Sequence, residues 1–358
     1  MKVAIIGSGL IAHTHAQAIR LLGHEITTVI SATEENARKF AKKWSIPKWG
    51  TTIDLALANC DCVHLCTPPM VHYHHAKAAI QAKKHVLCEK PLTISPQEAN
   101  ELVKLAKEQK VLAAVNFNVR YHEASNRAKQ LLSSPNFGDI QLIHGSYLQE
   151  FHASSDVYSW RYREKLGGKM RAVTEIGSHW VDLVRHWTGL EIVEVLAHFA
   201  NFNRTRFLTN DGLIHRTEKD QSTSVEVHSE DAATILFKCT NGAIGNVVLS
   251  EVTHGKKNEL SLTITGSQQA LSWNSERPYQ LELGQKNRGI RVDTQPFADG
   301  FNGTFYALFE EFYNAISNDK KLVDCTFPTF YDGYINATIC EAIYQSATNG
   351  SVWVNVLI

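Results

Sequence analysis

A glycine-rich turn directly behind the first apolar segment constrains the fold of this chain more than any other feature. Residues 3–6 are apolar and lead into Gly7-Ser8-Gly9-Leu10-Ile11-Ala12. In such a G-x-G-x-x-A turn, the first glycine lets the chain reverse and the second lets backbone approach a pyrophosphate, while the small last residue lets a helix pack close to its strand. A strand before this turn and a helix after it predict a dinucleotide-binding domain.

The first third of the chain alternates between strand-like and helix-like patterns. Strands are expected at 2–6, 25–30, 62–66, 85–88 and 112–116, and helices at 11–22, 34–44 and 74–82. A further helix begins behind Ser95-Pro96-Gln97-Glu98, which has the form of a capping box with proline at the first helical position. This alternation is typical of a doubly wound parallel sheet of the Rossmann type.

Past about residue 123 the pattern changes to long runs of alternating apolar and polar residues. These runs cover 140–150, 193–203, 232–239, 243–252 and 259–265, and Asn241-Gly242 between two of them is a strong hairpin signal. Residues 205–230 are polar and poorly patterned, as in a long surface loop. We therefore expect an α/β dinucleotide-binding domain over 1–122 and an α+β domain with a large, mainly antiparallel open sheet over 123–358.

The charge balance and the cysteines narrow the range of partners. The 358 residues include 36 Lys and Arg against 36 Asp and Glu, which leaves no electrostatic footprint for nucleic acid or an anionic membrane. No apolar run could span a bilayer and no cleavage-like region follows the apolar start, so we expect a cytoplasmic protein with a small neutral or polar ligand. The seven cysteines lie mostly in apolar runs, and Cys60-x-Cys62 lacks zinc-site spacing, so buried thiols and no metal are expected.

Three side chains are candidates for acid–base chemistry. Glu89-Lys90-Pro91 ends an expected strand, and strand carboxyl ends border the ligand crevice in such a sheet, so Lys90 is expected to face what the dinucleotide faces. A helical pattern over 172–188 places Glu175 and His179 four residues apart, on one helical face. An imidazole titrates near neutrality without help, which favours His179 as the acceptor of a substrate hydroxyl proton. Lys90 would then hold and polarise the oxygen, and Glu175 would orient the imidazole.

Further motifs follow one another in a characteristic order. They are Thr67-Pro68-Pro69-Met70-Val71-His72, Asn118-Val119-Arg120, Gly167-Gly168, the run E-I-G-S-H-W-V-D over 175–182 and the run F-P-T-F-Y-D-G over 327–333. Together with the glycine-rich turn and Glu89-Lys90-Pro91, they resemble the Gfo/Idh/MocA oxidoreductases over nearly the whole chain.

This resemblance implies roles for individual residues. Lys90 would contact both the nicotinamide and the reacting hydroxyl, His179 would be the acid/base supported by residue 175, and the bond before Pro91 would be cis. The implied cofactor site consists of Gly7, Ser8, Gly9, Leu10, Ile11, Ser31, Thr67, Pro68, His72, Glu89 and Lys90.

The chain departs from the family pattern at two positions. Glu175 stands where the family usually has Asp, so its longer side chain alters the geometry available to His179. Ser31-Ala32-Thr33 ends the second expected strand, where NAD-preferring members have an acid for the ribose hydroxyls. A serine does not repel a 2′-phosphate and Arg38 is the nearest cation, whereas Glu34 and Glu35 disfavour a phosphate. These residues slightly favour NADP as the cofactor, with NAD as the alternative.

The substrate is expected to be a sugar or a related polyol. Residues 145–150 (G-S-Y-L-Q-E) and Trp160-Arg161-Tyr162 resemble the sugar-oxidising branch of the family, which includes levoglucosan and glucoside dehydrogenases. A sugar pocket needs aromatic faces for ring C–H surfaces and forked donors for hydroxyls. The candidates for these contacts are Asn118, Arg120, Tyr158, Trp160, Arg161 and His179.

We therefore expect an NAD(P)-dependent oxidoreductase that transfers a hydride between the nicotinamide and a secondary hydroxyl or ketone of a sugar, glycoside or cyclic polyol. One alternative is an NAD-dependent glycoside hydrolase that uses transient oxidation and elimination. The other is a non-catalytic dinucleotide-binding sensor. The large sheet of the second domain, by resemblance, predicts a homodimer or homotetramer.

Overall fold

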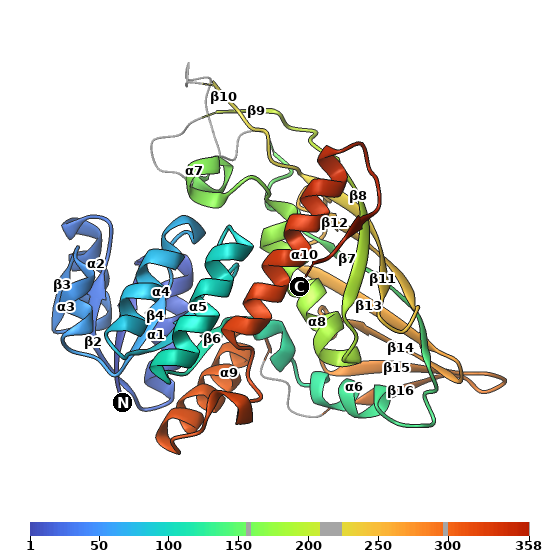
Figure 1. Ribbon diagram of the computed structural model, residues 1–358, viewed down its shortest axis with the longest axis horizontal. Coiled ribbons are helices and arrows are strands. Elements are labelled where there is room, and N and C mark those ends of the chain that lie inside the picture. Colours follow the sequence, from blue (N-terminus) through green and yellow to red (C-terminus); the bar gives the residue numbers. More distant parts are fainter. Residues whose placement is uncertain (155–158, 208–223, 296–299, 358) are drawn as a thin grey trace. The chain divides into compact units, whose positions relative to one another are not determined.

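The computed structural model describes residues 1–154, 159–207, 224–295 and 300–357 (Figure 1). The chain divides into two compact units, Met1–Tyr121 with Asp299–Ala337 and His122–Ala298 with Thr338–Ile358. The early segment of the first unit ends at Tyr121, one residue before the expected boundary at 122. The unit also contains residues 299–337, which the sequence analysis assigned to the domain over 123–358.

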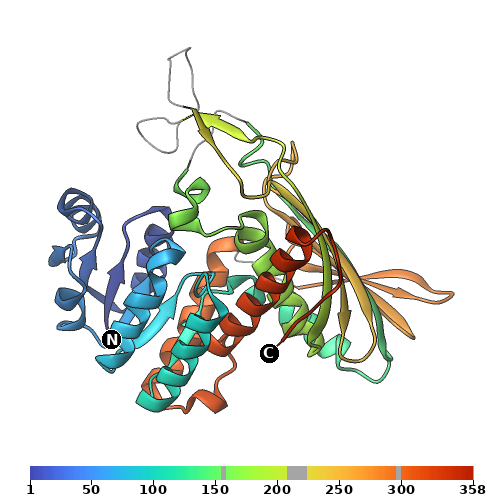
Figure 2. The ribbon, with the colours of Figure 1, turned by 45° about the horizontal axis from the view of Figure 1, so that its top comes forward.

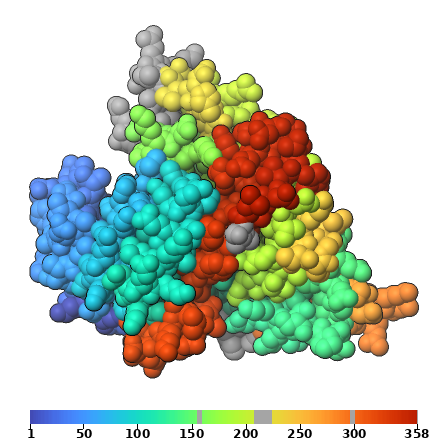
Figure 3. Space-filling view, viewed as in Figure 1, coloured from blue at the N-terminus to red at the C-terminus, as the bar shows by residue number. Residues whose placement is uncertain are grey.

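The first unit is built on a six-stranded parallel sheet in the order β3-β2-β1-β4-β5-β6. The strands are β1 (Lys2–Ile6), β2 (Glu25–Ile30), β3 (Lys48–Gly50), β4 (Cys62–Leu65), β5 (His85–Cys88) and β6 (Ala113–Val115). The helices between them are α1 (Leu10–Leu21), α2 (Glu34–Trp44), α3 (Ile53–Leu57), α4 (His72–Gln81) and α5 (Pro96–Gln109), and α4 and α5 lie on the outer surface in Figure 3. The Rossmann expectation is confirmed; the short β3 and α3 were not expected.

The strand order reverses between β1 and β4, which is where open α/β sheets bind their ligands. The helix expected behind the capping box is confirmed, because the Ser95 side chain accepts the backbone N–H of Glu98. Hydrophobic residues of β1, β4 and the helices make the sheet a buried centre for this unit.

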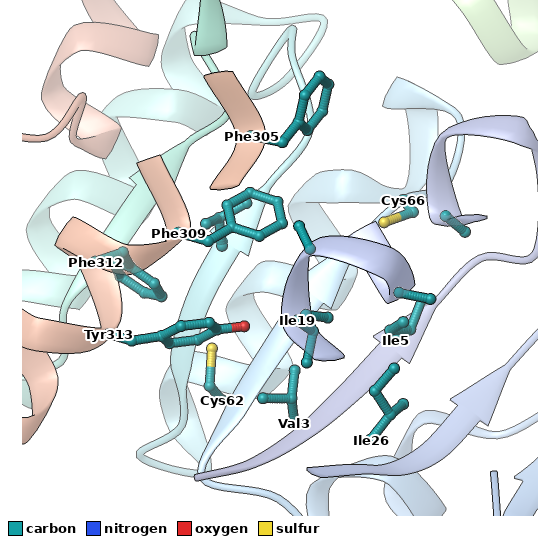
Figure 4. Packing of buried hydrophobic residues seen from close by; sticks show 14 of the residues in the cluster. Val3, Ile5, Ile19, Ile26, Cys62, Cys66, Phe305, Phe309, Phe312 and Tyr313 are labelled. Atoms are coloured by element: carbon teal, nitrogen blue, oxygen red, sulfur yellow. The ribbon is translucent and has the colours of Figure 1, made fainter. Parts of the chain in front are cut away.

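Aromatic side chains explain why a late segment joins the first unit. Helix α9 (Gly300–Ser317) packs Phe305, Phe309, Phe312 and Tyr313 into the core around β1 and α1, as Figure 4 shows. Helix α10 (Phe330–Thr348) begins in this unit and ends in the other, since the division falls after Ala337.

The second unit is built on a nine-stranded sheet in the order β16-β15-β14-β13-β7-β12-β11-β8-β17. Among the described strands of this sheet, only β7 and β12 pair in parallel, so the expected mainly antiparallel sheet is confirmed. Its strands are β7 (Ile140–Leu148), β8 (Ile192–Ala200), β11 (Ala232–Cys239), β12 (Ile244–Ser250), β13 (Glu259–Gly266), β14 (Gln269–Asn274), β15 (Gln280–Gln285), β16 (Gly289–Thr294) and β17 (Val354–Asn355).

This sheet buries one face and exposes the other. In β13 buried and partly buried residues alternate strictly, and Figure 2 shows the sheet as a curved layer. Helix α6 (Ser125–Leu132) packs on α8 (Ser178–Thr188), which contacts β7. The other face carries exposed apolar side chains, among them Leu142, Leu236, Ile244 and Val248.

The expectation of an irregular loop over 205–230 is wrong at both ends. Strands β9 (Thr205–Phe207) and β10 (Ser224–Glu226) pair antiparallel there, since short polar strands leave little alternation to detect. Residues 208–223 between them lie outside the described residues. Within the described chain, no helix combines the length and the apolar character needed to cross a bilayer.

Candidate active site

The glycine-rich turn has the backbone geometry that a pyrophosphate site requires. Gly7 has φ +113°, and a Cβ there would lie 2.4 Å from the carbonyl oxygen of Cys66, at the end of β4. Gly9 precedes α1 in extended conformation and brings no side-chain cap, and the first turn of α1 has no acidic residue. No acidic side chain of its own first turn therefore neutralises the positive end of this helix, which fits a bound phosphate.

Hydroxyl groups mark the end of β2. The Ser31 Oγ lies 2.6 Å from the Ser8 Oγ. The serine after β2, where such folds bind a ribose hydroxyl, therefore contacts the serine of the glycine-rich turn. The Thr33 hydroxyl caps α2 by accepting the N–H of Asn36 at 3.2 Å. Glu35 pairs with Lys39 at 2.6 Å on the exposed side of the same helix. These contacts fit the ribose end of a dinucleotide.

His72 joins the turns that follow β4 and β5. The buried ring places Nε2 2.7 Å from the Thr67 carbonyl oxygen and Nδ1 2.9 Å from the Pro91 carbonyl oxygen. Both ring nitrogens therefore face backbone acceptors, which leaves no lone pair directed at a metal. Within the described residues, no group of three or more His, Cys, Asp or Glu is arranged to hold a metal ion.

The buried carboxylate of Glu89 holds the turn that carries Lys90. The Lys90–Pro91 bond is cis, as expected, and the Lys90 backbone N–H donates to Glu89 Oε2 at 3.3 Å. Glu89 Oε1 accepts from His15 Nε2 at 2.8 Å and from Asn116 Nδ2 at 2.5 Å. Burial opposes ionisation, but His15, Lys90 and Asn116 together keep the pKa of Glu89 below its ordinary value.

Asn118 and Arg120 are bonded within the first unit. Both lie in a short 3₁₀ helix, Asn118–Tyr121. The Asn118 amide donates to the Thr304 hydroxyl at 2.7 Å, and Arg120 pairs with Asp332 at 2.8 Å. These bonds fix both side chains, and their contact with a substrate stays a prediction.

In the second unit, the expected helix over 172–188 is an irregular one. Residues Val173–Gly177 form a π-helix that leads into α8, so Glu175 lies on the wider turn and His179 in the first turn of α8. The Glu175 carboxylate pairs with Arg161 Nε at 3.1 Å, and this charge raises the pKa of Arg161. The Arg161 guanidinium also lies 4.7 Å from the Trp160 ring centroid. The support of His179 by Glu175 stays a prediction, and Tyr158 lies outside the described residues.

A buried cluster of charges supports this π-helix, and the sequence analysis missed it. The Glu230 carboxylate accepts the backbone N–H of Arg171 and Val173. The Arg171 guanidinium pairs with Asp231 and, at 2.9 Å, with Glu251. Burial raises the pKa of Glu230 and of Glu251 to about 7. The Asn241-Gly242 hairpin was a usable signal, because its register brings Asp231 beside Glu251, and adjacent buried acids need a cation.

The Rossmann fold and the phosphate-binding turn define a dinucleotide-binding protein. Residues 1–117 match the family described as oxidoreductase family, NAD-binding Rossmann fold, and residues 125–272 match the GFO/IDH/MocA C-terminal domain. The chain therefore belongs to the Gfo/Idh/MocA oxidoreductases, which confirms the resemblance found in the sequence.

Named relatives align with the chain from end to end. Levoglucosan dehydrogenase of Pseudarthrobacter phenanthrenivorans is 26% identical over 99% of this chain and 98% of its own length. Glucose-6-phosphate 3-dehydrogenase of Bacillus subtilis is 24% identical over 97% of each chain. Among solved structures, levoglucosan dehydrogenase in complex with NADH and levoglucosan has a TM-score of 0.89 at 24% identity, over 100% of this chain and 99% of that one.

Proposed function

We propose that this protein is an NAD(P)-dependent dehydrogenase that acts on a secondary hydroxyl of a sugar, glycoside or cyclic polyol. The observation that carries the proposal is the pairing of motifs in one family member: Lys90 in the turn after β5, and His179 in the first turn of α8. End-to-end similarity to levoglucosan dehydrogenase and glucose-6-phosphate 3-dehydrogenase supports a sugar as the substrate class.

The residues divide the work between cofactor and substrate. Gly7, Ser8, Gly9, Leu10 and Ile11 would hold the pyrophosphate, with Ser31, Thr67, Pro68 and His72 along the rest of the dinucleotide. The bound nicotinamide supplies the hydride acceptor. Lys90 holds the carbinol oxygen as its C–H bond breaks, and His179 accepts the proton of that hydroxyl, so the products are a ketone, reduced cofactor and one proton. Asn118, Arg120, Trp160 and Arg161 are proposed to bind the sugar hydroxyls and ring.

Cofactor choice and assembly are also part of the proposal. Ser31 at the end of β2, with the Ser8 hydroxyl of the glycine-rich turn 2.6 Å away, accommodates a 2′-phosphate more readily than an acid at this position would, so we propose NADP as the better cofactor, with NAD as the alternative. The exposed apolar face of the nine-stranded sheet is proposed to pair with a second copy in a homodimer or homotetramer.

A substrate screen tests the proposal directly. Purified protein is mixed with sugars, glycosides and inositols, with NAD and NADP in separate series, and reduced nicotinamide is followed by absorbance. We expect turnover with at least one sugar or cyclic polyol, faster with NADP. Release of an aglycone without accumulation of reduced nicotinamide would select the hydrolase instead. A complete lack of hydride transfer across the panel would contradict both activities and leave the sensor.

A further inference from the structure

A continuous hydrogen-bond chain runs through the interior of the first unit to the turn that carries Lys90. The Tyr313 hydroxyl on α9 lies 2.7 Å from His64 Nε2 on β4. His64 Nδ1 lies 2.9 Å from His15 Nδ1 on α1, and His15 Nε2 lies 2.8 Å from Glu89 Oε1. None of the four residues is more than 7% exposed.

We infer one direction for these hydrogen bonds, with Glu89 ionised and the His15 ring taken as neutral. An ionised Glu89 can only accept, so His15 Nε2 carries a hydrogen and donates it. If the His15 ring is neutral, its Nδ1 is then an acceptor, which requires a hydrogen on His64 Nδ1. His64 Nε2 in turn accepts, and the Tyr313 hydroxyl donates to it. Each donor therefore points toward the carboxylate.

The surroundings disfavour a proton added to His64. Burial, followed by the neighbouring His15 and His24, holds the pKa of His64 well below its ordinary value. The centroid of the Phe309 ring lies 4.8 Å from that of the His15 ring and 4.8 Å from that of the His64 ring, and both histidines are fully buried. The other titratable groups whose charge couples to Glu89 are His72, Cys66, Cys88 and Lys90.

We propose that Tyr313, His64 and His15 are positioning residues that hold Glu89 ionised and oriented beside Lys90. Glu89 then holds the Lys90 turn by accepting its backbone N–H. The catalytic part of this inference rests on the proposed dehydrogenase function. The direction of the chain does not, because it is a property of the protein alone.

Nitrogen NMR of the full-length protein with ¹⁵N-labelled histidine tests the direction. Between about pH 6 and 8 we expect His15 as the neutral Nε2–H tautomer and His64 as the neutral Nδ1–H tautomer, which is the rarer form. A protonated His15 or His64 in this range, or His64 with its hydrogen on Nε2, would overturn the proposal whether or not the protein transfers hydride.

The variant Tyr313→Phe tests the positioning role, because it keeps the ring and removes the first donor. The matched control is Tyr306→Phe on the same helix, because Tyr306 is not one of the four residues of the hydrogen-bond chain. In Tyr313→Phe we expect a shifted His64 Nε2 resonance, an acid limb of the kcat profile moved to higher pH, and about a fivefold loss of kcat with unchanged Kd for the cofactor.

Two outcomes count against that role. Unaltered His64 resonances in Tyr313→Phe would show that the hydroxyl does not end the chain. If the tautomers are as expected but Tyr313→Phe has the same kcat and pH profile as Tyr306→Phe, the hydrogen-bond chain would have only a structural role in the core. The NMR measurement needs no substrate. It therefore distinguishes failure of the proposed dehydrogenase function from failure of the proposed hydrogen-bond chain.

Discussion

Glu230 Oε1 lies 2.9 Å from the backbone nitrogen of Val173, so a carboxylate just before β11 caps the π-helix that carries Glu175. The same oxygen accepts the Arg171 N–H at 3.0 Å. Buried N–H groups at a helix start are costly to leave unpaired, and this segment leads directly into His179. We therefore expect the orientation of His179, the proposed acid/base, to depend on Glu230. Glu230 is 57 residues from Val173, the residue whose N–H it accepts.

Removal of this cap should lower the stability of the protein. We expect Glu230→Ala to reduce the free energy of unfolding by about 1–3 kcal/mol, because two buried N–H groups lose their acceptor. Glu230→Gln keeps one acceptor oxygen and should lose less. Urea unfolding measures the difference, and Glu226→Ala, at an exposed position, is the control with a change within about 0.5 kcal/mol. An Ala variant as stable as that control would contradict a capping role.

How much of this could be predicted from the sequence depended on the range of the contacts. Five strands of the six-stranded parallel sheet and the β11–β12 hairpin come from local patterns and were found, whereas the three-residue strand β3 was not. Strands β14 to β16 were missed, since each shows at most two buried apolar residues in alternation, such as Leu271 and Trp273.

Long-range contacts explain the remaining omissions. Tyr313 meets His64 across a separation of 249 residues, and no local period records such a pairing. For the same reason, the packing of α9 into the core of the first unit could not be predicted from the sequence. The candidate residues Lys90 and His179 were found because they lie in short family motifs, whereas the groups that hold them, Glu89 apart, carry no motif.

Loss of the Lys90 ammonium should lower turnover strongly without weakening cofactor binding. In Lys90→Met we expect kcat to fall about a hundredfold to a thousandfold, because one charge that stabilises the reacting oxygen is gone. The dinucleotide site at Gly7 and Gly9 is untouched, so cofactor Kd, measured by calorimetric titration, should change little. Near-normal turnover in this variant would remove Lys90 from the mechanism.

A carboxylate at the end of β2 should turn the cofactor preference toward NAD. Ser31→Asp places a negative charge where the 2′-phosphate of NADP would bind, and an acid there also accepts the ribose hydroxyls of NAD. We expect the ratio of kcat/KM for NADP over NAD to fall at least about tenfold. Ser31→Ala separates loss of the Ser8 contact from the added charge, and an Asp variant no different from the Ala variant would count against the assignment.

The pH dependence of stability should carry the signature of a buried neutral histidine. Burial lowers the pKa of His122 to about 4, below the ordinary value of about 6.5, so the unfolded chain binds its proton first. Its contribution to stability is full above about pH 6.5 and is lost as pH falls toward 4. We expect His122→Gln to lose up to about 3 kcal/mol less than the wild type between pH 7.5 and 4, by urea unfolding. The control is the exposed His228→Gln, which should follow the wild type.

Two glycines allow the steric and conformational demands of the first turn to be separated. Gly7 and Gly23 both have positive φ, at +113° and +76°, but only at Gly7 would a Cβ meet another group, the Cys66 carbonyl oxygen at 2.4 Å. Gly23→Ala should cost about 1 kcal/mol from its backbone conformation alone. Gly7→Ala should cost more and should also weaken dinucleotide binding at least about tenfold, because β1 and β4 must move apart at the switch point. Thermal unfolding and cofactor titration of both variants measure this. Equal losses in the two would mean that the close approach to β4 is not what requires a glycine at position 7.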